Sequence, residues 1–150
     1  MFNDPTLLED IFRVSNRIAM FAWVILIFLP RRWPALNLVP ALAVPVLLSL
    51  AYGAIIMVVF FQGEGGFTSL SNVRLLMSAD SALLAGWLHY LAFDLFIASI
   101  IAEKADDIGL SRVIQAPILL LTFLAGPLGF FLFQFTSGSW QIATHKRGAA

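Results

Sequence analysis

The stretch DSALLAGWLHYLAFDLFIASIIAE, residues 80–103, decides the fold of this chain. Between its two terminal acidic residues it contains no lysine, arginine or glutamate, and it exceeds the roughly 20 residues that a helix needs to cross a bilayer. His89 and Asp94 nevertheless lie in its middle. An ionisable group at that depth costs about 2.5–3.5 kcal/mol on insertion scales, so such groups usually face protein and mark function. We therefore expect this helix to carry the functional site.

The composition indicates a membrane protein of one domain. The chain is 60% hydrophobic, its mean hydropathy is +0.89, and charged residues make up 12%, against about 25% in soluble domains. Nine basic and nine acidic residues leave no net charge, which argues against nucleic acid as a partner. Cysteine is absent, which excludes disulfides, thiolate metal sites and a cysteine nucleophile.

The predicted fold class is all-α, an integral membrane bundle of four transmembrane helices in a single domain. Four apolar segments are separated by charged and turn residues. The predicted spans are residues 12–30, 38–61, 81–102 and 113–135, and a polar tail follows at 137–150. The second and fourth spans carry residues that kink helices, which neighbouring helices in a membrane can accommodate. These residues are Pro40, Pro45, Pro117, Gly126, Pro127 and Gly129.

Boundary residues refine this prediction. Residues 67–77 suit a short interfacial element, Ser78 or Asp80 could cap the third span, and Gly109 could terminate it. The first span has a short charge-free part, so a signal peptide is a competing interpretation, although the nearest cleavage-like string, residues 41–43, lies well beyond it. Four spans would place both ends of the chain on one side. The lysine and arginine count differs little between the sides and leans only slightly toward cytoplasmic ends.

The two ionisable residues of the third span face different directions. At 100° per residue, His89 and Asp94 are about 140° apart around the helix, so they do not pair with each other. Asp94 is either a proton donor or acceptor, or a structural carboxyl bonded to Tyr90, Arg17, Asn16 or an indole. His89 is either a general acid–base group or a hydrogen-bonded link between helices. The sequence leaves both pairs of alternatives open.

Other residues are candidates for ligand binding. Trp87 and Tyr90 could flank a long conjugated ligand, or simply pack in the bundle. Gly126, Pro127 and Gly129 could let a flat ligand approach the backbone, or form a packing kink. The only other histidine, His145, lies in the tail, so we predict no metal site, and no cofactor motif is present.

The polar sequence before the second span suggests a membrane anchor. Arg31 and Arg32 precede Trp33. Such basic residues beside an interfacial aromatic residue are typical of a lipid headgroup anchor.

Several strings resemble the abscisic acid-deficient-four-like membrane family over most of the chain. They are WLHYLAFDLF at 87–96, PILLLTFLAGPLGFFLF at 117–133, LPRRW at 29–33, FTSL at 67–70, and Asn16. That family includes plant plastid proteins needed to make neoxanthin from violaxanthin, and bacterial relatives. The plant proteins carry a plastid-targeting extension that this sequence does not show, so the chain is more similar to the bacterial branch.

The resemblance implies a four-span protein that acts on carotenoids or related isoprenoid lipids. The plant reaction is an isomerisation in which an epoxide opens and an allene forms by proton loss, so it would need an acid and a base. Asp94 and His89 would be the candidates, supported by Tyr90. The alternative is a non-catalytic protein that binds or organises pigment or lipid. A small transporter is a third, less favoured hypothesis. We expect membrane lipid as a partner and a bacterial cell membrane as the location, with homo-oligomerisation left open.

Overall fold

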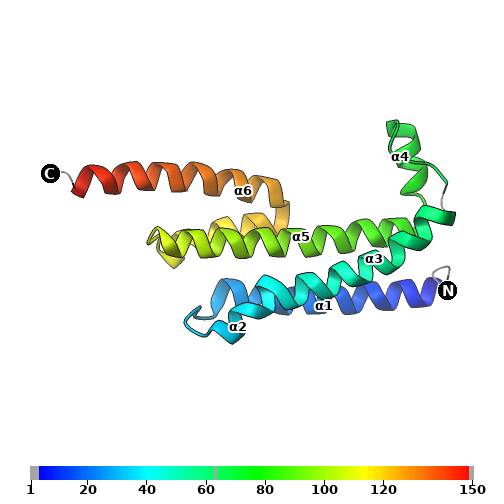
Figure 1. The fold of residues 1–150 in the computed structure, drawn as a ribbon, viewed down its shortest axis with the longest axis horizontal. Coiled ribbons are helices and arrows are strands. Elements are labelled where there is room, and N and C mark those ends of the chain that lie inside the picture. Colours follow the sequence, from blue (N-terminus) through cyan, green and yellow to red (C-terminus); the bar gives the residue numbers. More distant parts are fainter. Residues whose placement is uncertain (1–3, 63, 149–150) are drawn as a thin grey trace.

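The computed structural model describes residues 4–62 and 64–148, and their regular structure is helical throughout (Figure 1). Four helices are long and apolar enough to cross a membrane, as the sequence predicts. The elements are α1 (Pro5–Phe28), α2 (Pro34–Leu38), a π-helical turn (Val39–Ala43), α3 (Val44–Gln62), α4 (Leu70–Leu76), α5 (Asp80–Asp107) and α6 (Arg112–Gly148). The second predicted span is therefore built from α2, the π-helical turn and α3, and α4 occupies the predicted interfacial position.

The helix ends agree with the sequence-based expectations in part. Gly109 follows α5 with a positive φ of 67°, the left-handed conformation that glycine adopts readily at a helix end. The expected side-chain cap of α5 is wrong, because Ala79 is the capping residue and makes no side-chain hydrogen bond. Ser78 instead donates its hydroxyl to the Leu75 carbonyl at 2.6 Å. Asp80 lies in the first turn, where the helix dipole favours a negative charge.

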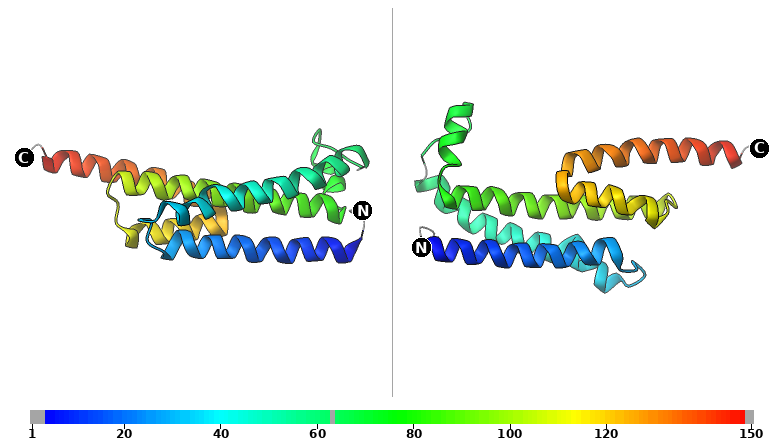
Figure 2. Two further views of the ribbon diagram at one scale, coloured as in Figure 1. Left: turned by 60° about the horizontal axis from the view of Figure 1, so that its bottom comes forward. Right: turned by 180° about the vertical axis from the view of Figure 1, so that it is seen from behind.

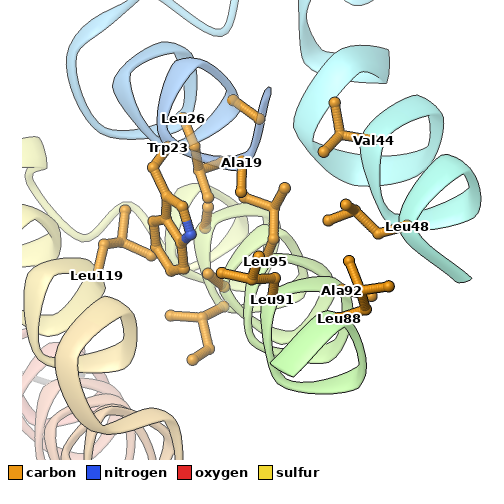
Figure 3. Close-up of a cluster of buried hydrophobic side chains, with 14 of the residues drawn as sticks. Ala19, Trp23, Leu26, Val44, Leu48, Leu88, Leu91, Ala92, Leu95 and Leu119 are labelled. Carbon is orange, nitrogen blue, oxygen red and sulfur yellow. The ribbon is translucent and has the colours of Figure 1, made fainter. Parts of the chain in front are cut away.

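Helix α5 is the centre of the molecule and packs against α1, α3 and α6. Small side chains on α5 are almost completely buried and let the neighbouring helices approach closely. They are Ala85, Ala92, Ala98, Ala102 and Ala105. Larger side chains from α1, α3 and α6 close over them, as Figure 3 shows around Trp23, Leu48 and Leu119. This packing fixes α5 on several sides and therefore fixes the direction in which each of its polar side chains points.

Helix α6 reverses its direction near its middle. Ala125 has φ −155° and ψ 71°, which no helix can contain, whereas the backbone remains helical at Pro117. Figures 1 and 2 show the chain advancing along α5, turning at the break and running back toward the end from which it came. We call residues 112–124 the first arm and residues 126–148 the second arm. The first arm is about 20 Å long at 1.5 Å per residue, so its tip would lie within a hydrocarbon core about 30 Å thick.

The reversal corrects one expectation about the ends of the chain. Four complete crossings would place both ends on the same side of the membrane. The beginning of α1 and the end of α6 instead lie at opposite ends of the molecule (Figure 1), because α6 turns back rather than continuing past the middle of α5. The second arm remains helical through the predicted polar tail to Gly148.

Arg31, in the turn after α1, is bonded to both α5 and α6 at the end of the molecule where α6 begins. Arg31 donates through one guanidinium nitrogen to Asp106 and the Ala102 carbonyl, each at 2.7 Å, and to Gln115 at 2.8 Å. Only 12% of its side chain is exposed. Burial lowers the pKa of Arg31, and the ion pair with Asp106 opposes that shift. The expectation that Arg31 is a headgroup anchor is therefore wrong, whereas Arg32 is exposed and lies over the Trp33 ring at 5.0 Å.

Candidate functional site

Asp94 lies near the middle of α5 and faces the break in α6. It is 14 residues after Asp80, or about 21 Å along the helix axis. One carboxyl oxygen, Oδ2, is buried and has no hydrogen-bond partner in the part of the chain that the structure describes. Buried polar groups in proteins are almost always hydrogen-bonded, so an exception needs a physical explanation. A ligand that donates a hydrogen bond is one such explanation.

Gly126 forms the wall opposite this carboxyl. A Cβ atom at that position would lie 2.6 Å from Cγ of Asp94, closer than real Cβ atoms come to other groups. The Gly126 backbone N–H lies beside the carboxyl. A larger residue at position 126 would therefore push the Asp94 carboxyl away from the break in α6.

Tyr90 compensates for the interrupted helical hydrogen bonding of α6. In a continuous helix the Phe123 carbonyl would accept from the N–H of Pro127, but proline has no N–H. The Tyr90 hydroxyl donates to the Phe123 carbonyl at 2.8 Å instead. The same hydroxyl also lies close to the Asp94 carboxyl. A phenol, a carboxyl and a broken helix thus meet in one place, and non-helical backbone at membrane depth is tolerated where protein groups satisfy it in this way.

Gly129 allows the two arms of α6 to fold together. A Cβ atom on Gly129 would lie 2.5 Å from Cα of Thr122, on the other side of the break. In a straight helix these two residues would be about 10 Å apart along the axis. Gly129 therefore permits the reversal of α6. It affects Asp94 only indirectly, through the shape of α6.

His89 lies away from this site. Its ring is exposed, stacks on Phe93 with a centroid distance of 4.6 Å, and lies 5.6 Å from the Tyr52 ring of α3. It therefore belongs to the α3 side of α5, while Asp94 belongs to the α6 side, in keeping with their separation of about 140° around the helix. The structure does not bring the two candidate acid–base residues together.

Trp87 lies next to the site on the α1 side. Its indole N–H donates to the Asn16 side-chain carbonyl at 3.1 Å, and its ring lies 5.8 Å from Phe12 and 5.3 Å from Tyr90. Asn16 therefore pairs with the indole and not with Asp94, and among the described residues no hydrogen bond or ion pair joins Arg17 to Asp94. The candidates that meet directly are Asp94, Tyr90 and Gly126, with Pro127 supplying the free carbonyl and Trp87 adjoining through Tyr90.

The Phe123 carbonyl, which accepts the Tyr90 hydrogen bond, is not among the candidate site residues predicted from the sequence. A signal for it exists, because the residue four positions before a proline inside a helix always loses its backbone donor. Applied to Pro127, this rule identifies Phe123 as an acceptor that needs another partner.

The arrangement can exchange a proton with an apolar ligand that carries an oxygen. A carboxyl and a phenol are the proton-transferring groups, and the surroundings are largely hydrocarbon. Within residues 4–61 and 64–142, no three histidine, aspartate or glutamate side chains come together in a group that could hold a metal ion.

Comparison with known proteins finds a family model that matches most of the chain. The model of a family described as ABA DEFICIENT 4-like matches residues 10–133, which include most of α1, all of α2 to α5, and the first arm and break of α6. No curated protein and no solved structure matches the chain. All the candidate site residues fall inside the matched region. By this match, the chain belongs to the ABA DEFICIENT 4-like family.

Proposed function

We propose that this chain is an integral membrane protein, placed in a bacterial cell membrane, that isomerises a carotenoid or related isoprenoid lipid by acid–base chemistry at Asp94. The observation that carries the proposal is the buried Oδ2 atom of Asp94, which has no hydrogen-bond partner within the described residues and faces the break in α6. An ionisable group at membrane depth is costly and is usually retained for function. Family membership supports the proposal but does not by itself establish an activity.

The isomerisation requires that one proton is donated to the substrate and that one proton is removed from it. The protonated Asp94 carboxyl would donate to an epoxide oxygen, the carbon–oxygen bond would break with its electron pair on oxygen, and an alcohol would form. The carboxylate would then remove a proton from the adjacent chain carbon, and the electrons of that C–H bond would form the second double bond of an allene. Substrate and product are isomers, so no oxidant, reductant or cofactor is required. Because the carboxyl ends in its starting state, His89 is not needed.

Tyr90 would act as a positioning residue in this scheme. Its hydroxyl is held by the Phe123 carbonyl at 2.8 Å while lying beside Asp94. This fixed phenol restricts the direction in which the carboxyl can turn, and its ring forms an apolar wall with Trp87. Positioning of this kind lowers the entropy cost of bringing the reacting groups together.

A second candidate function is non-catalytic binding of a pigment or lipid. It is favoured by the location of His89, because the acid and the base that the family resemblance implies lie on different sides of α5. Under this alternative, the unpartnered Asp94 oxygen accepts a hydrogen bond from a hydroxylated ligand and no bond in the ligand breaks.

The test is a pigment profile of the source organism. Carotenoids are separated and their masses measured with the gene present, deleted and restored. We expect one pigment to disappear on deletion, an isomer of equal mass to accumulate, and restoration to reverse both changes. An unchanged profile would refute the isomerase function. Loss of a pigment without accumulation of an isomer would instead support the binding function.

A further inference from the structure

His89 is an exposed polar side chain at a depth where a membrane protein is surrounded by hydrocarbon. It lies nine residues after Asp80 and 14 residues before Glu103, so it is about 14 Å and about 21 Å along α5 from these charged residues. Histidine side chains within membrane-spanning helices almost always face the interior of the bundle or a water-filled cavity. The position of His89 on the outer surface of the molecule therefore needs an explanation.

Two hydroxyl groups of α3 share this outer surface. The Tyr52 ring lies 5.6 Å from the His89 ring, and Ser49 is exposed three residues earlier, on the same face of α3. Ser99 on α5 donates its hydroxyl to the backbone of its own helix at 2.9 Å, but the side chains of Ser49, Tyr52 and His89 have no hydrogen-bond partner within residues 4–61 and 64–142. We call the surface formed by Ser49, Tyr52, His89 and Phe93 the α3–α5 flank.

Neither lipid tails nor the other helices of the chain satisfy this flank. Hydrocarbon offers no hydrogen bonds, so polar groups exposed to it are costly. Helices α1 and α6 contact α5 through Trp87 and Asp94, which lie on other sides of the helix. A neutral imidazole has one donor and one acceptor, and a hydroxyl can both donate and accept. The flank therefore carries every group that a second copy of the same flank needs.

A two-fold axis along the membrane normal brings the two unlike residues of the flank together. Helices α3 and α5 pack side by side and run in opposite directions (Figure 1), and the contact between their rings places Tyr52 and His89 at nearly the same depth. Rotation about the normal keeps each residue at its depth and sets α5 of one copy opposite α3 of the other. His89 of each copy then faces Tyr52 of the other, which is the reciprocal contact of a symmetric dimer.

We propose that the α3–α5 flank is the interface of a homodimer, in which the Tyr52 hydroxyl of each copy is hydrogen-bonded to the His89 ring of the other. Ser49 and Phe93 lie one helical turn from this pair, on the side toward the middle of α5, and extend the contact. The dimer removes two exposed imidazoles from the lipid. It uses the side of α5 that is remote from Asp94, so the inference does not rest on the proposed function.

The experiment measures energy transfer between copies of the full chain in phosphatidylcholine vesicles. The chain contains no cysteine, so Phe67→Cys provides a single labelling site at an exposed residue between α3 and α4. Donor-labelled and acceptor-labelled copies are mixed, and added lipid dilutes them. The two tyrosines of the chain supply a matched pair of variants, because Tyr52→Phe and Tyr90→Phe each remove one hydroxyl, on the α3 side and on the α6 side of the bundle.

We expect the dependence of energy transfer on the acceptor fraction to show two copies per assembly. Tyr52→Phe and His89→Leu should each weaken association about tenfold, because each removes two symmetry-related hydrogen bonds between helices. The double variant should be little weaker than either single variant, since both substitutions remove the same bonds. His89→Gln keeps a donor and an acceptor and should weaken association less than His89→Leu does, and Tyr90→Phe should leave association unchanged.

Unfolding in excess detergent, which separates the copies, distinguishes an interface residue from one that holds the chain itself together. Tyr52→Phe and His89→Leu should leave the midpoint of unfolding unchanged, whereas Tyr90→Phe should lower it, because the Tyr90 hydroxyl is bonded to the Phe123 carbonyl. A wild-type chain that stays monomeric at every lipid content would overturn the dimer and leave lipid or another protein as the cover of the flank. Equal weakening of association by Tyr52→Phe and Tyr90→Phe, or additive effects of Tyr52→Phe and His89→Leu, would overturn the proposed pairing.

Discussion

The reversal of α6 makes a prediction about two glycines in the same helix. Gly129→Ala places a methyl group against the backbone of Thr122, where a Cβ would lie 2.5 Å from the Thr122 Cα. Overpacking of this kind costs about 1–3 kcal/mol. Gly138→Ala meets nothing within 4 Å and should gain about 0.5–1 kcal/mol, because alanine loses less backbone entropy than glycine in a helix. The free energies of unfolding of the two variants should therefore differ by about 1.5–4 kcal/mol, the sum of these two effects.

The assay is unfolding in mixed detergent micelles by added denaturing detergent, followed by circular dichroism. Gly138→Ala serves as the matched control because it makes the same chemical change in the same helix. In a straight α6, Gly129 and Thr122 would be about 10 Å apart along the axis, and Gly129→Ala would then stabilise the protein as Gly138→Ala does. Equal stabilisation by both substitutions would refute the reversal of α6.

Three further predictions concern single side chains. Arg31→Met should lower the free energy of unfolding by about 2–3 kcal/mol, below the range for a fully buried pair because the Asp106 side chain is 39% exposed. Its neighbour control, Arg32→Met, should cost only about 0.5–1 kcal/mol by losing an exposed cation–π contact, and similar losses in the same unfolding assay would contradict the buried role of Arg31. Tyr90→Phe should cost about 0.5–1.5 kcal/mol through the lost interhelical hydrogen bond, and an unchanged midpoint would exclude that bond. Hydrogen bonds from Thr6 hold the pKa of Asp4 below its ordinary value. The Asp4 cap is therefore complete above the ordinary aspartate pKa and is lost as the pH falls through the lowered value. The protection factors of the amides in the first turn of α1 should then fall, and Asp4→Asn should abolish that pH dependence.

The position of α5 was predictable from the sequence because only one charge, that of Asp94, interrupts its long apolar stretch. The different directions of His89 and Asp94 were also predictable, since they follow from helical periodicity alone. The structure adds which neighbour each residue meets. His89 meets Tyr52, and Asp94 meets the break in α6.

The direction of α6 was not predictable in the same way. Hydropathy over residues 113–135 is the same for a straight crossing and for a helix that turns back, because both bury apolar side chains in a membrane. The Gly126–Pro127 step indicates a weak point in the helix, but the angle at such a point depends on contacts from distant residues. Here those contacts come from Asp94 and Tyr90 on α5.

The different roles of Arg31 and Arg32 could not be predicted from the sequence either. Adjacent arginines cannot be told apart by local sequence. Which of them is buried depends on where the end of α5 and the beginning of α6 lie in the fold. Asp106 and Gln115 come together with Arg31 because the first arm of α6 packs against α5. The partner residues are 75 and 84 positions away in the sequence, a separation that no local pattern reveals.

The central claim is that Asp94, and not His89, performs the chemistry of this protein. The most direct measurement is the carotenoid profile of cells lacking the gene and supplied with the wild type, Asp94→Asn or His89→Gln, with equal amounts of folded protein verified in the membrane. Asp94→Asn keeps the shape of the side chain but cannot exchange a proton. We predict that Asp94→Asn fails to restore the missing pigment and that His89→Gln restores it. Full restoration by Asp94→Asn would contradict the claim.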